Sequence, residues 1–419
     1  MSQGQAAPPK PAPLAAIPLD IWALGFVSLL MDVSSEMIHA LLPIYLVTVM
    51  GASMGAIGLI EGIAEATAST AKVFSGALSD WLGKRKALTA LGYGLAAIAK
   101  PVFPLATSIG WVMAARFVDR IGKGVRGAPR DALIADIAPA ELRGASFGLR
   151  QSLDTVGAFL GPAIAIGLMA LTGSQFRVVF WAAALPAFLA VALLLIAVRE
   201  PAASRASRPA RFPLSAAALR QFGGAFWLVV GIAFVFTLAR FSEAFLVLRA
   251  QGLGLPVALA PMTFVTMNVV YALAAYPAGV LSDRFERMMI VTIGFALLIA
   301  ADLALAFAGG LAGAALGVAL WGLHLGMTQG VLSTLVADAA PASQRGAAFG
   351  IFNLASGLAL LVASLVAGAL WDAFGARATF LAGAAFTALA LIGLAVAARF
   401  APAVHASVAI SRRDEKKPG

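Results

Sequence analysis

Long apolar stretches recur along this chain, and each is long enough to cross a lipid bilayer as a helix. The hydrocarbon core of a bilayer is about 30 Å thick, which about 20 helical residues span. We therefore predict an all-α membrane protein with twelve transmembrane helices. Their expected ranges are 21–49, 55–80, 87–107, 109–133, 146–171, 177–198, 222–248, 257–282, 288–307, 311–336, 346–371 and 377–398.

The composition excludes a water-soluble domain. Hydrophobic residues make up 61% of the 419 residues, charged residues make up 12%, and the mean hydropathy is +0.92. A soluble domain of this length would have to expose a very large apolar surface. The 42 glycines and 21 prolines are compatible with helices here. Small residues let membrane helices approach closely, and neighbouring helices satisfy a kinked backbone.

Positive charge is concentrated on one side of the predicted bundle. The chain carries 30 Lys and Arg against 20 Asp and Glu. In the predicted loops, only Arg177, Arg249 and Arg377 fall on the side opposite the termini. Because loops rich in Lys and Arg stay in the cytoplasm, we expect a multi-pass protein of the cell inner membrane with both termini cytoplasmic. The net charge of +10 then indicates topology and contact with anionic lipid, not nucleic-acid binding.

The chain is expected to form two helical bundles joined by a linker. Residues 1–20 are rich in Pro and Ala and lack the basic start of a signal peptide, so we expect a disordered cytoplasmic tail. The stretch 199–221, rich in Pro, Ser and Arg, is the expected cytoplasmic linker. The other predicted units are an N-terminal six-helix bundle over 21–198, a C-terminal six-helix bundle over 222–398 and a basic cytoplasmic tail over 399–419.

Two short motifs occur twice, once in each predicted bundle. GALSDWLGKRK begins at Gly76 and its partner GVLSDRFER at Gly279, while DIAPAELRGASFG begins at Asp136 and DAAPASQRGAAFG at Asp338. The two pairs have nearly the same offset, which is almost half of the chain. One half therefore duplicates the other in parallel orientation, as in many secondary transporters.

At these motifs the chain resembles the major facilitator superfamily, whose signature between helices 2 and 3 is Gly-x-Leu-x-Asp-[Arg/Lys]-x-Gly-[Arg/Lys]-[Arg/Lys]. The residues that fit it are Gly76, Leu78, Asp80, Gly83, Lys84 and Arg85. Trp81 replaces the usual basic residue. The second copy keeps Asp283 and Arg284 but has Glu286 where glycine is usual. The resemblance covers all twelve predicted helices and implies the twelve-helix fold of that superfamily.

A second pattern of this superfamily is associated with proton-driven antiporters and reads Gly-x8-Gly-x3-Gly-Pro-x2-Gly-Gly on helix 5. The matching positions are Gly148, Gly157, Gly161 and Pro162. Ala165 and Ile166 replace the final glycine pair. The resemblance implies a proton-coupled antiporter. Glycines permit close packing and proline bends a helix, so we expect the four matching residues to form a hinge.

The charged turn in each half is expected to form a conformational latch. A carboxylate at a helix end, close to the N–H groups of a neighbouring helix and to a basic cluster, makes charge-assisted hydrogen bonds in one conformation only. We assign this role to Asp80 and Arg85, with Gly83 turning the chain. The alternative is that the basic residues only fix the topology. The expected latch residues are Gly76, Asp80, Gly83, Lys84, Arg85, Asp283 and Arg284.

Ionisable residues inside predicted helices need a partner or a water-filled path. In helix 1, the spacing of Asp32, Glu36 and His39 places them on one face. In helix 7, Glu243 corresponds to Glu36 through the duplication. We expect Asp32, Glu36 and Glu243 to carry protons, with Glu36 and Glu243 facing each other across a central cavity. The alternative is a closed hydrogen-bond network that holds helix 1 to a neighbour, which is the expected role of His39.

Helix 4 carries a basic stripe that topology alone does not explain. Its members are Arg116, Arg120, Lys123 and Arg130. The second bundle has no such stripe. We expect Arg116 and Arg120 either to bind an anionic substrate or to hold nearby carboxylates charged until substrate displaces them. The expected substrate-binding residues are Arg116, Arg120, Arg240, Glu61, Glu65, Asn268, Tyr271 and Gln329.

Several of these assignments have structural alternatives. Arg240 and Glu243 are three residues apart and could form only a local ion pair. Lys72 could neutralise Glu61 or Glu65 on helix 2. The polar residues of helices 8 and 10 could serve packing alone.

No enzyme motif occurs in the chain. It lacks a Walker loop, a His-Glu-x-x-His zinc pair and a Gly-x-Ser-x-Gly elbow, and it has no cysteine. We expect no enzymatic activity, no metal and no cofactor, with energy drawn from an ion gradient. The first hypothesis is a proton antiporter that exports an amphipathic or anionic small molecule by alternating access. The alternatives are a proton symporter for an anionic nutrient or metal chelate, and a membrane receptor or scaffold. The expected partners are substrate, protons and lipid but no nucleic acid, and the protein is expected to work as a monomer.

Overall fold

The structure is a computed structural model of the chain and describes residues 16–139, 142–200, 222–340 and 345–400. Within these ranges the chain forms helices and turns but no strand. The first half contains α1 (Leu19–His39), α2 (Leu42–Thr48), α3 (Met54–Leu82), α4 (Arg85–Ala99), α5 (Val102–Leu105), α6 (Ile109–Ile137), α7 (Arg143–Leu171) and α8 (Phe176–Ala197). The second half contains α10 (Gly224–Ala239), α11 (Ala244–Gly252), the short 3₁₀ helix η4 (Val257–Leu259), α12 (Met262–Arg284), α13 (Arg287–Phe307), α14 (Leu311–Ala339), α15 (Arg345–Phe374) and α16 (Ala376–Phe400). The predicted all-α class is confirmed.

Three of the predicted spans are broken into two helices. The span expected at 21–49 divides into α1 and α2, with Pro43 in the first turn of α2, where a backbone N–H is not needed. Pro101 likewise separates α4 from α5. The span expected at 222–248 breaks at residues 240–243, between α10 and α11, although no proline occurs there.

Ten helical segments of the described chain are long and apolar enough to span a membrane. Helices α3 and α6, with 29 residues each, are also long enough. They carry the charges predicted for helices 2 and 4, and these charges need partners inside the protein.

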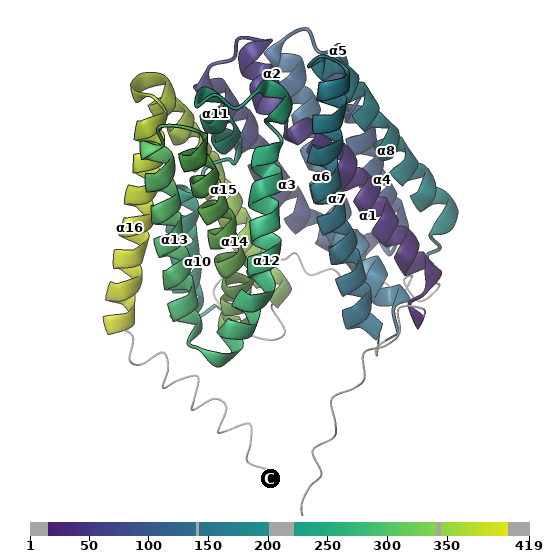
Figure 1. Cartoon of the computed structure of the whole chain (residues 1–419). Coiled ribbons are helices and arrows are strands. Elements are labelled where there is room, and N and C mark those ends of the chain that lie inside the picture. The colour runs from purple at the N-terminus through teal and green to yellow at the C-terminus, as the bar shows by residue number, and fades with distance from the viewer. Residues whose placement is uncertain (1–15, 140–141, 201–221, 341–344, 401–419) are drawn as a thin grey trace, which may run out of the picture.

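The helices of the two halves lie on opposite sides of the molecule (Figure 1). We call the side where α1 begins and α3 ends the lower face, and the side that holds α2 and α11 the upper face. Helix α3 packs against α15, and α7 packs against α12, so both contacts join the halves. The exact bundle boundaries stay predictions. Much of the predicted linker and of both tails lies outside the described residues.

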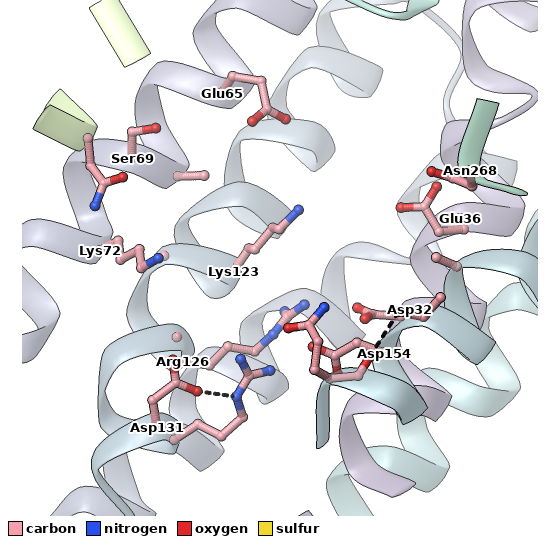
Figure 2. Close-up of a pocket in the computed structure, with 18 of the residues that line it drawn as sticks. Asp32, Glu36, Glu65, Ser69, Lys72, Lys123, Arg126, Asp131, Asp154 and Asn268 are labelled. Atoms are coloured by element: carbon pink, nitrogen blue, oxygen red, sulfur yellow. Dashed lines mark hydrogen bonds and ion pairs between the residues drawn. The ribbon is translucent and has the colours of Figure 1, made fainter. Parts of the chain in front are cut away.

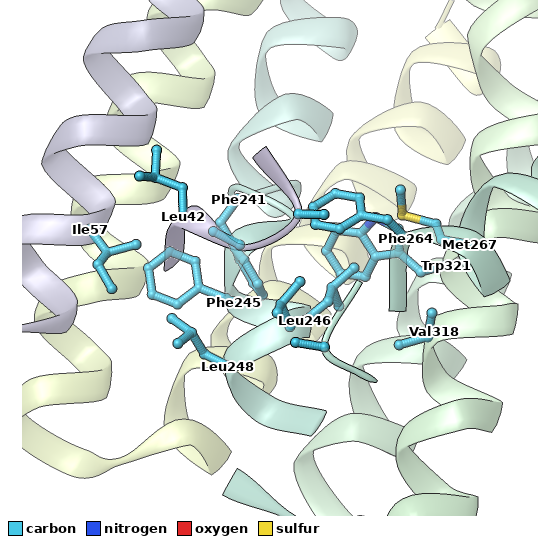
Figure 3. Packing of buried hydrophobic residues seen from close by; sticks show 14 of the residues in the cluster. Leu42, Ile57, Phe241, Phe245, Leu246, Leu248, Phe264, Met267, Val318 and Trp321 are labelled. Carbon is cyan, nitrogen blue, oxygen red and sulfur yellow. The ribbon is translucent and has the colours of Figure 1, made fainter. Parts of the chain in front are cut away.

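Apolar and polar contacts close the molecule towards the upper face. One buried cluster combines Leu42 and Ile57 from the first half with Phe245 and Phe264 from the second (Figure 3). Nearby, the carboxylate of Asp372 at the end of α15 accepts hydrogen bonds from the first two backbone N–H groups of α3, at 2.9 and 2.8 Å. A carboxylate at a helix N-terminus also interacts favourably with the helix dipole. The halves are thus sealed together on this side.

Glycines bring α7 directly against the acidic face of α1. A Cβ atom at Gly157 would lie 2.8 Å from the backbone oxygen of Leu29, and one at Gly161 would lie 2.7 Å from the Cβ of Glu36. The space around Gly148 is open, and helix α7 continues through Pro162. The glycines predicted to form a hinge therefore include two that fix where Glu36 and its neighbours sit.

This packing predicts that Gly161→Ala destabilises the protein, whereas Gly167→Ala does not. The added methyl group at position 161 meets α1 at less than 3.0 Å, and such overpacking costs about 1–3 kcal/mol. At Gly167 nothing lies within 4 Å of the added Cβ, so the better helix propensity of alanine adds up to about 1 kcal/mol of stability. Thermal unfolding of the purified variants in detergent measures the difference. Equal melting temperatures would contradict the proposed packing.

Candidate functional site

A cavity of about 450 Å³ lies between the halves, towards the lower face. We call it the lower cavity. Most of its lining comes from α1, α3, α6 and α7, and Asn268, Tyr271 and Asn353 contribute from the second half. Its charged residues are Asp32, Glu36, Glu65, Lys72, Lys123, Arg126, Arg130, Asp131 and Asp154. Figure 2 shows Lys123 pointing into it from α6, between Glu65 and Arg126.

A second cavity of about 350 Å³, the deep cavity, adjoins the first and lies closer to the upper face. The two cavities share Glu36, Glu65, Lys123, Ala158 and Asn268. Glu243 and Glu36 both line the deep cavity, one from each half. The two glutamates that the duplication aligns therefore lie around one space.

An ion-pair network ties α1, α3 and α6 together at the wall of the deep cavity. Arg116 Nη2 donates to Glu61 Oε2 at 2.8 Å, and each of these side chains is only 2% exposed. His39 lies beside the same oxygen, with Nε2 at 3.6 Å, while its Nδ1 is 3.5 Å from Glu36 Oε2. The imidazole thus connects the carboxylate that pairs with Arg116 to one that lines both cavities.

His39 also contacts the other half. Its ring centroid is 4.9 Å from that of Phe264 in α12. The sequence argument gave His39 only a structural role. The structure places its ring between two carboxylates and an aromatic side chain of the opposite half, which is a position that responds to relative movement of the halves.

A second buried pair lies behind the cavity wall and was missed from the sequence. Lys100 Nζ donates to Asp119 Oδ1 at 2.8 Å and to Ser35 Oγ at 3.0 Å. Lys100 follows the last residue of α4, next to Pro101. A lone lysine in an apolar stretch gives no periodic signal, and only the fold shows that it neutralises Asp119.

Some charged residues of the cavities have no ion pair with another described side chain. Lys123 and Asp32 are examples. Arg120, one turn before Lys123 in α6, does have an ion pair, with its Nη1 3.3 Å from Glu65 Oε1. Asp32 lies next to Asp154 in Figure 2, and Asp154 in turn pairs with Arg150 at 2.8 Å. Unpaired charges beside water-filled space are available to protons and to a charged solute.

Most of the predicted substrate-binding residues line one of the two cavities. These are Arg120, Arg240, Glu61, Glu65, Asn268, Tyr271 and Gln329. Arg116 does not line either cavity, because it is buried against Glu61. In this conformation Arg116 acts on the cavity only through that pair, so direct contact between Arg116 and substrate is not supported here.

Arg240 and Glu243 flank the break between α10 and α11. Arg240 follows the last residue of α10, and Glu243 precedes the first residue of α11. The helical spacing that would pair them is lost, and no ion pair joins them in the described structure. The alternative of a local ion pair is therefore not seen in the described residues, and the guanidinium of Arg240 lies 6.0 Å from the ring centroid of Phe236.

The charged turn of the first half lies at the lower face. Gly83 ends α3 with φ +61°, a left-handed conformation that glycine adopts without strain, and its N–H donates to Ser79 at 3.0 Å. Arg85 forms an ion pair with Asp136 and donates to the backbone oxygen of Ala132 at 3.0 Å. The two repeated motifs of the first half therefore meet at this turn.

Part of the expected latch cannot be placed. The side chains of Asp80, Asp283 and Arg284 lie outside the described residues. Gly76 packs against Ala128 of α6, and Lys84 is exposed at the start of α4. The latch role of these residues stays a prediction. Across the described chain, no cluster of three or more His, Asp or Glu residues is suited to hold a metal ion.

Comparison with known proteins gives a consistent match. The sequence profile of the Major Facilitator Superfamily matches residues 24–359 and 244–418. An uncharacterised MFS-type transporter of Methanocaldococcus jannaschii is 32% identical over 364 residues, covering 84% of this chain and 88% of that protein. The quinolone resistance protein NorA of Staphylococcus aureus is 26% identical over 187 residues, 45% of this chain and 47% of NorA.

Solved transporter structures share the fold. A variant of the nucleoside transporter NupG has a TM-score of 0.76 at 14% identity, covering 90% of this chain and 99% of NupG. A bacterial homologue of the human lysosomal transporter Spinster, in an inward-facing and occupied conformation, has a TM-score of 0.74 at 16% identity, covering 90% of this chain and 96% of that one. At these identities the likeness is one of fold.

The buried pair predicts that Glu61→Gln destabilises the protein more than the double replacement of Glu61 by Gln and Arg116 by Met. Removing one partner leaves an uncompensated buried charge, at a cost of about 3–5 kcal/mol, whereas removing both leaves none. Asp131→Asn is the control, because that side chain is 39% exposed and its loss costs about 1 kcal/mol or less. Thermal unfolding of the purified variants measures these effects. Arg116→Met is measured as the second single variant. If the stability lost in the double variant equals the sum of the losses in Glu61→Gln and Arg116→Met, the two residues are not coupled.

Proposed function

The chain belongs to the major facilitator superfamily, and from that premise we propose that it is a proton-coupled transporter that exports an amphipathic or anionic small molecule in exchange for protons. The observation that carries the proposal is the charged space between the halves, which both halves line and which the upper-face contacts seal on one side. Alternating access requires such a space, opened in turn to each side of the membrane.

The lower face is the cytoplasmic side in this proposal. The basic residues of the α3–α4 turn and Arg143 at the start of α7 lie there. Arg177 at the start of α8, Arg249 in α11 and Arg377 at the start of α16 lie towards the upper face. This distribution follows the positive-inside rule. The described conformation then corresponds to one that faces the cytoplasm, in an inner membrane. One chain forms the whole cavity, which is compatible with a functional monomer.

Proton coupling is assigned to Asp32, Glu36 and Glu243. Glu36 contacts both cavities and His39, so a proton added to Glu36 weakens its attraction to the imidazole. Solute and proton would compete for the same group. That competition is the physical basis of exchange, because each can occupy the cavity only after the other has left.

Export is favoured by two observations. Two glycines of the helix-5 antiporter pattern pack α7 onto α1, Gly157 at Asp32 and Gly161 at Glu36. The partial relative NorA is described as a resistance protein. The runner-up is proton-driven uptake of an anionic solute. It is supported by Arg120, Lys123 and Arg240, which supply positive charge to the deep cavity.

The proposal predicts that Glu36→Gln abolishes proton exchange while the protein still folds. In inside-out membrane vesicles with a preset proton gradient, a quinolone or an organic acid that is a substrate should collapse the gradient through the native protein. Through Glu36→Gln the collapse should fall at least tenfold, because the glutamine cannot exchange a proton. Glu286→Gln, at the exposed start of α13, should behave like the native protein.

Two outcomes would overturn this assignment. If Glu36→Gln collapses the gradient with unchanged pH dependence, Glu36 is not the coupling residue. If solute moves only in the same direction as protons, the protein takes up its substrate and the export hypothesis fails.

A further inference from the structure

Helix α13 carries a carboxylate that belongs to neither cavity. Asp302 is fully buried, at 0% exposure, and both of its carboxylate oxygens lack a hydrogen-bond partner in the described structure. No sequence pattern singled it out, because it is a lone acid in an apolar helix. Among the described residues one other aspartate is buried, Asp119 at 3% exposure, and it has an ion pair with Lys100.

The fold provides a specific space for this side chain. A Cβ atom at Gly383 of α16 would lie 2.6 Å from Asp302 Oδ2 and 3.1 Å from the ring of Phe241. Any residue larger than glycine at this position would therefore collide with the carboxylate. The same contacts show that the Phe241 ring lies next to the Asp302 site.

Among the described side chains of the surrounding helices, no cation pairs with Asp302. Helix α14 presents His324, whose Nδ1 contacts the backbone oxygen of Gly294 at 3.0 Å. Arg377 at the start of α16 lies over Phe307, at 4.3 Å from the ring centroid. On the neighbouring α10 and α11, Arg240 lies near Phe236 and Arg249 donates to the last carbonyls of α13. The charged residues of α12 stand at its lower end, far along the bundle from Asp302.

An ionised carboxylate without a partner is very unfavourable in such a place, so the group persists there by holding a proton. The neutral acid removes the charge, and what remains is the smaller cost of burying a polar group without a hydrogen-bond partner. The described conformation is therefore one in which Asp302 is protonated.

Phe241 separates this acid from the transport pathway. It lies in the non-helical segment 240–243 and lines the deep cavity. Its ring packs against Phe245, Trp321 and Phe380, with centroids 5.6, 5.5 and 5.4 Å away. Figure 3 shows Phe241, Phe245 and Trp321 within the apolar cluster that closes the molecule towards the upper face. Opening that face must separate this cluster, which would admit water to Asp302.

We propose that Asp302 is a second proton-binding site, loaded from the upper side, whose protonation is required before the upper face can close. A proton from upper-side water forms an O–H bond on the carboxylate as the aromatic cluster reassembles over it. When the face reopens, the same bond breaks and the proton returns to water. The inference rests on the alternating access proposed above, but it does not depend on the substrate or on the direction of its transport.

The test uses the absence of native cysteine. Val49→Cys after α2 and Phe374→Cys at the end of α15 place spin labels on exposed positions of the two halves at the upper face. In the purified full-length protein, the distance between labels should be short at low pH and should lengthen as the pH rises. Asp302→Asn resembles the protonated acid in shape and charge, so it should keep the short distance at every pH.

Two controls separate this proposal from the proposed function. Asp20→Asn removes an acid at the lower face, near the start of α1, and should keep the native pH response. Glu36→Gln should also keep a pH-dependent distance even where it abolishes exchange in vesicles. If Asp302→Asn responds to pH as the native protein does, or if the native distance does not change with pH, the Asp302 proposal is wrong. Failure of exchange in vesicles alone would instead count against the proposed function.

Infrared spectroscopy supplies a readout that does not depend on conformational change. The native protein should show the carbonyl stretch of a protonated carboxylic acid under conditions that close the upper face, and Asp302→Asn should lose one such band. Identical spectra would show that Asp302 is ionised and would overturn the proposal. Deuterium exchange shifts the same band and so identifies it as a protonated carboxyl, and its loss in Asp302→Asn assigns it to Asp302.

Discussion

The need to neutralise charge inside the membrane determines how the first half is built. Arg116 and Glu61 form a pair in which both side chains are almost completely buried, and such a pair holds two helices in one relative position because separation exposes an unpaired charge. His39 extends the network to α1 and Glu36. Lys100 and Asp119 repeat the arrangement between the end of α4 and α6. The cavity wall is therefore a rigid electrostatic frame.

The second half follows a different rule. Among the described side chains of α10–α16 no ion pair occurs. Asp302 and His324 are buried without an ionic partner, and Arg240 lines the deep cavity with its guanidinium 6.0 Å from the ring centroid of Phe236. Aromatic packing around Phe241 and Trp321 takes the place of charge pairing. A half held by apolar contacts separates from its partner without exposing paired charges. The sequence argument assigned proton chemistry to Asp32 and Glu36 of the first half and to Glu243 of the second, and Asp302 adds a further candidate in the second half.

Different parts of the structure were predictable to different degrees. Apolar stretches of about 20 residues predict membrane helices because lipid leaves the backbone no other partner, and Pro43 and Pro101 mark two of the breaks. The break at 240–243 has no local signal, so it depends on tertiary contacts such as the hydrogen bond from the Ser242 N–H to Ser364.

The candidate site was predictable as a set of residues but not as a set of partners. The duplication aligned Glu36 with Glu243, and both line the deep cavity. The sequence could not show that Arg116 forms a buried ion pair with Glu61 or that Lys100 neutralises Asp119. Nor could it show that Gly383 leaves room for the carboxylate of Asp302. Each of these pairs joins residues from different helices, so only packing reveals it.

The central claim is that the two halves rock about one shared cavity, so that the faces open in alternation. Spin labels at Val49→Cys and Phe374→Cys report on the upper face, and labels at Trp81→Cys and Phe285→Cys, also exposed positions, report on the lower face. Both distances are measured in the same preparations across a pH series. The account predicts that one distance lengthens whenever the other shortens. Two distances that change in the same direction, or that both stay fixed, would contradict it.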